Sequence, residues 1–155
     1  SETDIAMMGA EAAQGHVTAA PYFQSVQTPE NQSVVQRFQD WLGEEATTNM
    51  VWEAAYSQVH LAANAMRLSN SVDPRAVREA LMGAEFRAPQ GLIRIDEDTG
   101  HTHLWPRIGR ANAKGQFDVI REAVSSVKPD PYSPFVCEKN WSMRIPLGAL
   151  GEEAL

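Results

Sequence analysis

The sequence predicts an α/β fold: a parallel sheet flanked by helices, with a β-meander towards the C-terminal end. Apolar residues recur at helical spacing in several stretches, the longest over residues 50–68. One early apolar run, residues 16–20, is typical of an inner strand, and three later runs separated by short turns are typical of a meander. Helical stretches placed between strand-like runs indicate helices that cover a sheet.

The first expected element is a short amphipathic helix over residues 4–14, because apolar residues recur at three- and four-residue spacing from Ile5 and Gly15 follows as a stop. Residues 16–20 follow as a strand that runs into residues 21–23. A parallel sheet needs several strands, and only this run has the pattern of an inner one. The sequence therefore indicates that further strands lie upstream of this chain.

A second helix is expected to start at Thr28. This residue is a capping type, Pro29 suits the first helical position, and Glu30 favours the positive end of the helix dipole. Gly43 ends the helical pattern. The residues expected on the buried face of this helix are Val34, Val35, Phe38, Trp41 and Leu42.

Two more helices are expected before the meander. The longer one covers residues 50–68, and its apolar residues occupy more than one stripe, so we expect it to pack on more than one side. The shorter one starts at Asp73 and ends at Gly83. Residues 88–91, Ala-Pro-Gln-Gly, break the helical pattern. The meander strands expected after this break are residues 92–95, residues 103–108 with an interruption at Pro106, and residues 116–120.

Composition and charge exclude several classes of function. The 155 residues suffice for one domain or a large part of one, and the hydrophobic share of 43% is that of a globular chain. The net charge of −7 argues against a nucleic-acid partner or an anionic membrane surface, because both require basic patches. No stretch approaches the roughly 18 apolar residues of a membrane span. Cys137, the one cysteine, has no internal disulfide partner, and no motif supplies a base for a catalytic thiol.

The strongest metal candidates are His101 and His103, which would share one face of a strand, with Asp96 and Asp98 nearby. Their spacing lacks a metal-ligand pattern such as His-Glu-x-x-His. The acidic run 96–100 also lacks the twelve-residue pattern of a calcium loop. We therefore favour a solvated hairpin loop over a metal site, and we expect no metal and no cofactor.

Glu53 lies near the start of the long expected helix and supports two interpretations. It is either a first-turn carboxylate stabilised by the helix dipole or a cleft carboxylate that accepts hydrogen bonds from a ligand amide or ammonium group. Four aromatic residues that would pack in a core or line a cleft occur near the same predicted element ends: Tyr22, Phe23, Trp52 and Tyr56. Tyr22 has the apolar body and polar tip suited to the end of a strand, where ligands of α/β sheets are bound.

Five short motifs occur in an order and at a spacing similar to those of a known family. They are Gly-His-Val-Thr-Ala-Ala-Pro-Tyr-Phe at residues 15–23, Trp-Glu-Ala-Ala-Tyr at 52–56, Ala-Pro-Gln-Gly at 88–91, Arg-Ile-Gly at 107–109 with Gly-Gln-Phe at 115–117, and Lys-Pro-Asp-Pro-Tyr at 128–132. The chain resembles the C-terminal part of type I periplasmic solute-binding proteins of the branched-chain amino-acid class. It is most similar to the urea and short-chain amide subgroup, which includes binding subunits of urea transporters and the amide-sensing regulator of aliphatic amidase.

The resemblance implies a two-lobed protein that closes on a small ligand about a hinge. It implies that residues 1–15 end one lobe, residues 16–23 cross the hinge, residues 24–127 contribute to the other lobe, and residues 128–155 return across the hinge and form a surface tail. The upstream half of the same protein would then be a partner of this chain. The resemblance also implies ligand binding without catalysis, so no catalytic residue is expected. The ligand-binding residues that it implies are Ser1, Tyr22, Phe23, Glu53 and Tyr56.

Three functions remain to be compared. The first is the substrate-binding component of a periplasmic ABC transporter, which takes urea, short-chain amides or related amino acids and docks on a membrane permease. The second is a cytoplasmic amide sensor of the same fold that controls a regulatory partner protein. A signal sequence with a lipobox cysteine in the precursor would favour transport over sensing. The third is a metal-dependent enzyme using His101 and His103, which would require stoichiometric zinc.

Overall fold

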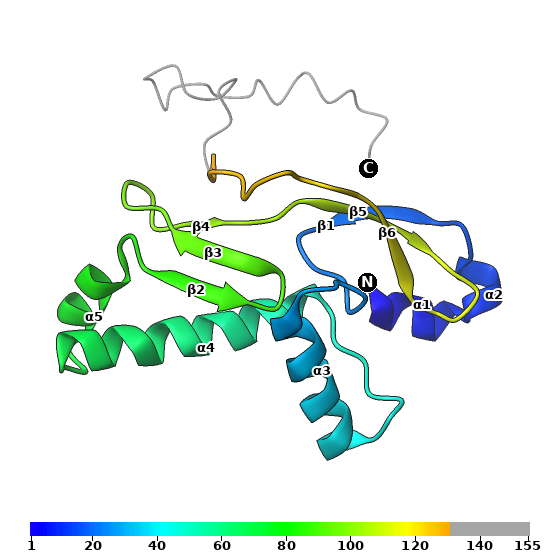
Figure 1. Ribbon diagram of the computed structural model, residues 1–155, viewed down its shortest axis with the longest axis horizontal. Coiled ribbons are helices and arrows are strands. Elements are labelled where there is room, and N and C mark those ends of the chain that lie inside the picture. The colour runs from blue at the N-terminus through cyan, green and yellow to red at the C-terminus, as the bar shows by residue number, and fades with distance from the viewer. Residues whose placement is uncertain (131–155) are drawn as a thin grey trace, which may run out of the picture.

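The computed structural model describes residues 1–130, whose course is drawn in Figure 1. The helices are α1 (Glu2–Met8), α2 (Ala10–Ala13), α3 (Pro29–Leu42), α4 (Met50–Ser69) and α5 (Pro74–Leu81). The strands are β1 (Val17–Ala20), β2 (Glu85–Ala88), β3 (Gly91–Ile95), β4 (Thr102–His103), β5 (Arg107–Ala111) and β6 (Phe117–Glu122). Within this part of the chain, no helix combines the length and the apolar character needed to cross a membrane. Cys137 and the predicted surface tail beyond residue 130 lie outside the described residues.

The strands form two separate three-stranded sheets, β1-β5-β6 and β2-β3-β4. Every pairing between them is antiparallel, so the predicted parallel sheet is not formed by residues 1–130 themselves. The prediction of one continuous meander is also wrong, because the chain passes from one sheet to the other between β4 and β5. Pro106 lies in this passage, and proline has no amide hydrogen with which to continue a strand ladder. Strand β5 instead pairs with β1, which lies far earlier in the sequence.

Local capping explains where the longer helices begin and end. Thr28 caps α3 as predicted, since its Oγ1 accepts a hydrogen bond from the Asn31 amide (3.1 Å), and Pro29 occupies the first helical turn. The side chain of Asn49 caps α4 in the same way. Asn70 ends α4 in the left-handed conformation, which asparagine tolerates better than most residues.

Two local predictions are wrong for different physical reasons. The helix expected over residues 4–14 is two helices, because Gly9 between α1 and α2 has a φ of +85°, outside the helical region. Strand β2 was not expected at all. It pairs with β3 through the turn at residues 89–90, and this pairing depends on a partner strand that the composition of residues 85–88 does not reveal.

The apolar faces of α3 and α4 are less covered than predicted. On α3, Val34 is buried, but Trp41 is 79% exposed and Leu42 is 53% exposed. Helix α4 buries a single stripe: Glu53, Ser57, Leu61 and Ala65. Val59 and Leu68 on the same helix are exposed. The predicted packing of this helix on more than one side is therefore not formed by residues 1–130.

The described residues build two separate apolar cores. The first joins α1 and α2 to the β1-β5-β6 sheet and consists of Ile5, Ala13, Tyr22, Phe23, Val26, Ala111 and Phe117. The second joins α4 to the other sheet and consists of Leu61, Ala88, Ile93 and Ile95. Figure 1 shows α4 running along the second sheet, while α1 and α2 lie beside the first. Three chain segments link these two packed units: the one that follows β1, the one that precedes β5, and the one that follows β6, where Val127 pairs with Leu104.

Gly109 in β5 lies against the ring of Phe23, and a Cβ atom at this position would lie 2.7 Å from that ring. The ring also packs against Phe117, with centroids 4.8 Å apart, so it has little room to move. We expect Gly109→Ala to lower the free energy of unfolding of the complete protein that contains this chain by about 1–3 kcal/mol, as overpacking does. Urea denaturation measures this loss.

Phe23→Leu provides the matched second variant for this prediction. In the Phe23→Leu background, the loss caused by Gly109→Ala should be smaller, because the smaller side chain vacates part of the contact. Strict additivity of the two losses would contradict the steric explanation.

Candidate functional site

The candidate site is built around Glu53, in the first turn of α4. This glutamate is 1% exposed. Its Oε1 accepts a hydrogen bond from Ser57 Oγ (2.9 Å), and its Oε2 accepts one from Gln90 Nε2 (2.7 Å). The spacing of four residues places Ser57 on the same face of the helix. Glu53 is therefore a buried acceptor that links α4 to the turn between β2 and β3.

Gln90 occupies this turn and bonds to three neighbours through three different groups. Besides the bond from its Nε2, its Oε1 accepts a hydrogen bond from the Trp105 amide (3.3 Å), and its carbonyl accepts one from Arg107 Nη2 (2.8 Å). Gly91 follows with a φ of +124°, and a Cβ there would lie 3.0 Å from the indole of Trp105. Glycine is required at this corner both for the backbone angle and for the close approach of the ring.

Arg107, at the start of β5, extends the network to the linking segments that follow β1 and precede β5. Its Nη1 donates hydrogen bonds to the carbonyls of Pro21 and Trp105, and its Nε donates one to Glu122 Oε2 (2.7 Å). The Arg107 side chain is 2% exposed. A planar guanidinium with five fixed donors is suited to binding several acceptors at once, which a lysine ammonium does less well.

Burial raises the pKa of Glu53 above its usual value of 4.5. The hydrogen bonds from Ser57 and Gln90, and the positive charge of Arg107, reduce this rise without cancelling it. The Glu53 carboxyl therefore holds a proton to a higher pH than an exposed glutamate does.

Glu53 also lines a cavity of about 80 Å³ between α4 and the β2-β3-β4 sheet. Ser57, Gln90 and Thr102 supply further polar groups to its wall, while Ile93 is among the apolar lining residues. A carboxylate, an amide and two hydroxyls at one small cavity can both donate and accept hydrogen bonds to a small polar molecule.

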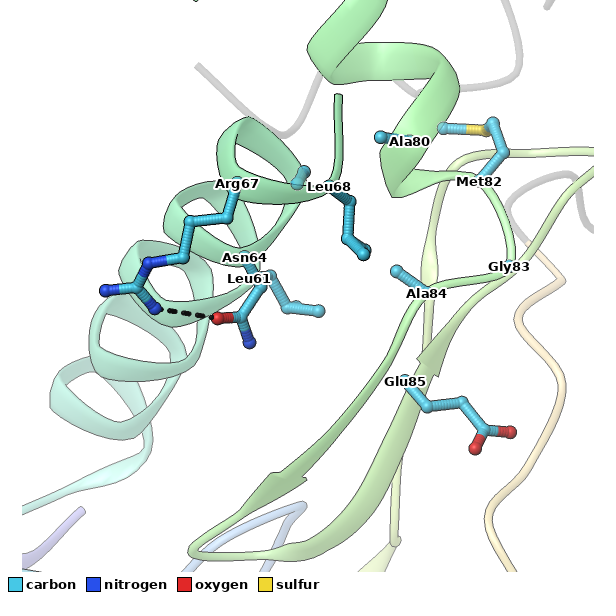
Figure 2. Close-up of a pocket in the computed structure, with 10 residues that line it drawn as sticks. Leu61, Asn64, Arg67, Leu68, Ala80, Met82, Gly83, Ala84 and Glu85 are labelled. Carbon is cyan, nitrogen blue, oxygen red and sulfur yellow. Dashed lines mark hydrogen bonds between the residues drawn. The ribbon is translucent and has the colours of Figure 1, made fainter. Parts of the chain in front are cut away.

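A larger hollow of about 470 Å³ lies between the C-terminal half of α4, α5 and the beginning of β2. Figure 2 shows Leu68 projecting from α4 into this hollow, with Arg67 bonded to Asn64 (3.3 Å) at its rim. None of the ligand residues predicted from the sequence lines it. The Glu53 cavity is therefore the stronger candidate, although it is smaller.

Comparison with known proteins identifies the family. The family model described as a periplasmic binding protein domain matches residues 1–138, which is most of the chain. The chain belongs to this family. The α/β fold class predicted from the sequence is thereby confirmed.

Solved structures of family members have the same fold. A solute-binding protein of an ABC transporter from Rhodopseudomonas palustris HaA2, in complex with p-hydroxybenzoic acid, is 26% identical with a TM-score of 0.67, over 83% of this chain and 35% of that one. A solute-binding protein from R. palustris in complex with benzoate is 16% identical with a TM-score of 0.72, over 81% and 34% of the two chains. An amino-acid ABC transporter substrate-binding protein from Pseudomonas fluorescens Pf-5 is 18% identical with a TM-score of 0.70, over 83% and 35%.

A curated relative carries a different kind of name. A protein from Geobacillus stearothermophilus named limonene hydroxylase is 33% identical over 129 residues, which make up 83% of this chain and 23% of that protein. The chain thus spans about a quarter of this relative and about a third of the solved structures that it matches.

In this periplasmic binding protein domain, the predicted hinge residues Tyr22 and Phe23 are packed in the first core, 0% and 1% exposed. The Tyr22 hydroxyl donates a hydrogen bond to Asn31 Oδ1 (2.8 Å) and shares another with Thr48 Oγ1 (2.7 Å). Burial raises the pKa of the Tyr22 hydroxyl. Both side chains support the segment after β1, and their contact with a ligand stays a prediction.

The domain does not gather the five predicted ligand residues around one cavity, since only Glu53 lines the cavity described above. Tyr56 stacks on Trp52, with ring centroids 5.4 Å apart, and its ring lies 4.4 Å from that of His60. Ser1 caps α1, and its hydroxyl donates to the Asp4 carboxylate (2.9 Å). Ligand contact by Ser1 and Tyr56 also stays a prediction.

The loop between β3 and β4 contains an ion-pair cluster. His103 Nε2 lies 3.3 Å from Asp96 Oδ2, and Lys128 Nζ lies 3.3 Å from the same oxygen and 3.0 Å from Asp98 Oδ2. His101 is exposed, as expected for a solvated loop, but Asp96 is 5% exposed and that part of the prediction is wrong. Through residue 130, no three His, Cys, Asp or Glu side chains are grouped as a metal site requires.

Sequence reasoning missed Gln90, Arg107 and Glu2. Gln90 and Arg107 lie within the motifs that carry the family resemblance. Their place in these motifs was the one feature of the sequence that could have identified them as functional residues. Glu2 is buried, and its Oε1 accepts a hydrogen bond from the Gln24 amide (2.9 Å). Its Oε2 has no hydrogen-bond partner among the described residues, and burial raises its pKa. A glutamate in the first turn of a helix is ordinarily exposed, so no local pattern indicated this burial.

The pH dependence of stability tests the environment of Glu53. The pKa of Glu53 is raised in the folded protein. The contribution of Glu53 to stability is therefore complete below about pH 4.5, its usual pKa, and is lost as the pH rises through the folded-state pKa. In Glu53→Gln, which keeps both hydrogen bonds possible, the free energy of unfolding should therefore fall less between pH 4.5 and pH 7 than in the wild type. Urea denaturation across this range gives the comparison.

Glu45→Gln is the control, because Glu45 is exposed. Its stability should follow that of the wild type at every pH. Glu2, whose pKa is also raised, makes the free energy of unfolding fall with pH in the same way in all three proteins. The difference in this pH dependence between the variants and the wild type therefore reports on Glu53 alone. Parallel wild-type and Glu53→Gln curves would show that burial does not perturb this carboxyl.

Proposed function

We propose that this chain is the C-terminal portion of the solute-binding component of an ABC transporter, which closes on a small solute by movement of two lobes. Membership of the periplasmic binding protein family supports this proposal. The single observation that carries it is the presence of two separate cores joined by three neighbouring linking segments, which follow β1, precede β5 and follow β6. Two packed units with few connections are what hinge closure around a ligand requires.

The pairing of β5 with β1 bears on where the lobes meet. The chain leaves the first core after β1 and builds α3, α4, α5 and the second sheet before β5 rejoins β1. We propose that residues 104–107 form one crossing between the lobes. The segment after β6, in which Val127 pairs with Leu104, forms a further crossing close to the one that the resemblance implied after residue 127. The remaining boundaries, with residues 1–15 ending one lobe and residues 16–23 crossing the hinge, stay as proposed.

We propose urea or a short-chain amide as the solute, with related amino acids as neighbouring possibilities. The subgroup resemblance suggests this class, and Glu53 supports it because a carboxylate accepts hydrogen bonds from an amide NH₂ group. The Glu53 cavity is small, about 80 Å³, which favours a small solute. An aromatic carboxylate such as benzoate would bring a second negative charge towards Glu53, which opposes binding whenever Glu53 is ionised.

We propose a binding role and no catalytic one. The match to the protein named limonene hydroxylase spans 23% of that protein, too little to transfer its reaction to this chain. The proposed location is the periplasm, where the permease of the transporter would be the partner. The alternative is a cytoplasmic amide sensor of the same fold, and a precursor without a signal sequence and lipobox cysteine would favour it.

Titration calorimetry on the complete protein tests the proposed ligand class. Urea and acetamide should bind with a Kd at least about tenfold lower than that of leucine or benzoate, since they alone present an NH₂ group beside little bulk. Glu53→Gln should weaken acetamide binding by about tenfold, because a charged acceptor is replaced by a neutral one.

Glu45→Gln, at an exposed position, should leave acetamide binding unchanged. Benzoate binding tighter than acetamide binding would reject the amide class while keeping the transporter role. Binding of none of the four solutes would reject the proposed function.

Intact mass spectrometry of the natural protein tests whether this chain is part of a longer binder. The denatured mass should lie well above 17.1 kDa, or a second polypeptide should accompany this one under native conditions. A natural product of 17.1 kDa that associates only with copies of itself would contradict the two-lobed arrangement.

A further inference from the structure

The side chain of Arg107 touches two of the three linking segments and both packed units. Its guanidinium donates to Pro21 O in the segment that follows β1, to Trp105 O in the segment that precedes β5, and to Gln90 O beside the second core. Its Nε donates to Glu122 in β6, which belongs to the first sheet. Four contacts from one rigid planar group fix the relative positions of four chain segments.

The surroundings of Arg107 make these contacts difficult to replace. Three of its acceptors are backbone carbonyls, and the side chain is 2% exposed, so water cannot substitute freely for the guanidinium. Gln90 links Arg107 to the cavity, because the Gln90 Nε2 donates a hydrogen bond to Glu53 in the cavity wall. A continuous chain of hydrogen bonds therefore runs from the linking segments through Gln90 to the cavity wall.

We propose that Arg107 is a positioning residue that sets the hinge between the two lobes and thereby the affinity for the solute, although it does not line the cavity. This inference rests on the proposed function. Loss of the guanidinium leaves these two linking segments joined only through the β1–β5 ladder, which ends at the Ala20–Arg107 pair, and this widens the range of lobe orientations. The closed, binding-competent orientation is then a smaller fraction of the population, and the apparent affinity falls by that fraction.

Arg107→Lys is the informative variant, because it keeps the positive charge and loses the planar fork. In the complete protein it should raise the Kd for acetamide by about tenfold, within the usual range of coupling between sites. Arg107→Met, which removes every donor, should raise it further. Arg110→Met is the matched control on the same strand, since Arg110 faces solvent, and it should leave the Kd within about twofold of the wild type.

A distance measurement separates hinge control from a general loss of stability and needs no ligand. Spin labels at Glu11→Cys on α2 and Arg78→Cys on α5, both exposed positions, report the separation of the two units in a Cys137→Ser background. Pulsed electron resonance should give a broader distance distribution for Arg107→Lys than for the wild type and Arg110→Met. In a second measurement, saturating acetamide should bring the distribution of Arg107→Lys to that of the wild type with acetamide.

The outcomes distinguish this inference from the proposed function. A wild-type distance distribution in Arg107→Lys, or an equal broadening in Arg110→Met, would overturn the role of Arg107. Broadening in Arg107→Lys alone, in a protein that binds none of the solutes, would support the hinge while rejecting the proposed function. A lower melting temperature with unchanged Kd and unchanged distance distribution would show that Arg107 contributes to stability only.

Discussion

The arrangement of this domain depends on one buried guanidinium. Arg107 satisfies the carbonyls of Pro21, Trp105 and Gln90, which would otherwise be buried without partners at the place where the two cores meet. An unpaired buried carbonyl is costly, so the guanidinium stabilises the observed positions of these segments. Glu122 forms an ion pair with Arg107, and Gln90 connects Arg107 to Glu53 through hydrogen bonds. The polar network thus holds together two units that share little apolar surface.

Several exposed apolar residues bear on the proposal that this chain is part of a longer protein. Trp41 on α3 and Val59 and Leu68 on α4 are exposed although they are large and apolar. Large exposed apolar residues are enriched where another part of a protein packs. The chain spans about a third of the solved structures that share its fold, which is consistent with the proposal that an upstream half packs here.

Fold and ligand are separate questions in this family. Structures with the same fold were solved with benzoate and with p-hydroxybenzoic acid, at 16% and 26% identity to this chain. A shared fold does not transfer a ligand, because specificity resides in a few side chains at the site. The distinguishing group here is Glu53, whose carboxyl is buried at a small cavity and has a pKa raised by burial. This acceptor supports the proposal of an amide ligand.

The sequence by itself determined the elements whose signals are local. The Thr28 cap, the extent of α4 and strand β1 follow from capping and periodicity within a few residues, and the family motifs indicated the fold class. Only the tertiary structure decided the rest, because it depends on contacts between distant residues. Strand β2, the split of the meander and the pairing of β5 with β1 each need a partner that local pattern cannot name. Glu53 was a candidate from its position, but its partners became visible only when folding brought Gln90 and Arg107 beside it, since burial and hydrogen bonding are properties of the assembled chain.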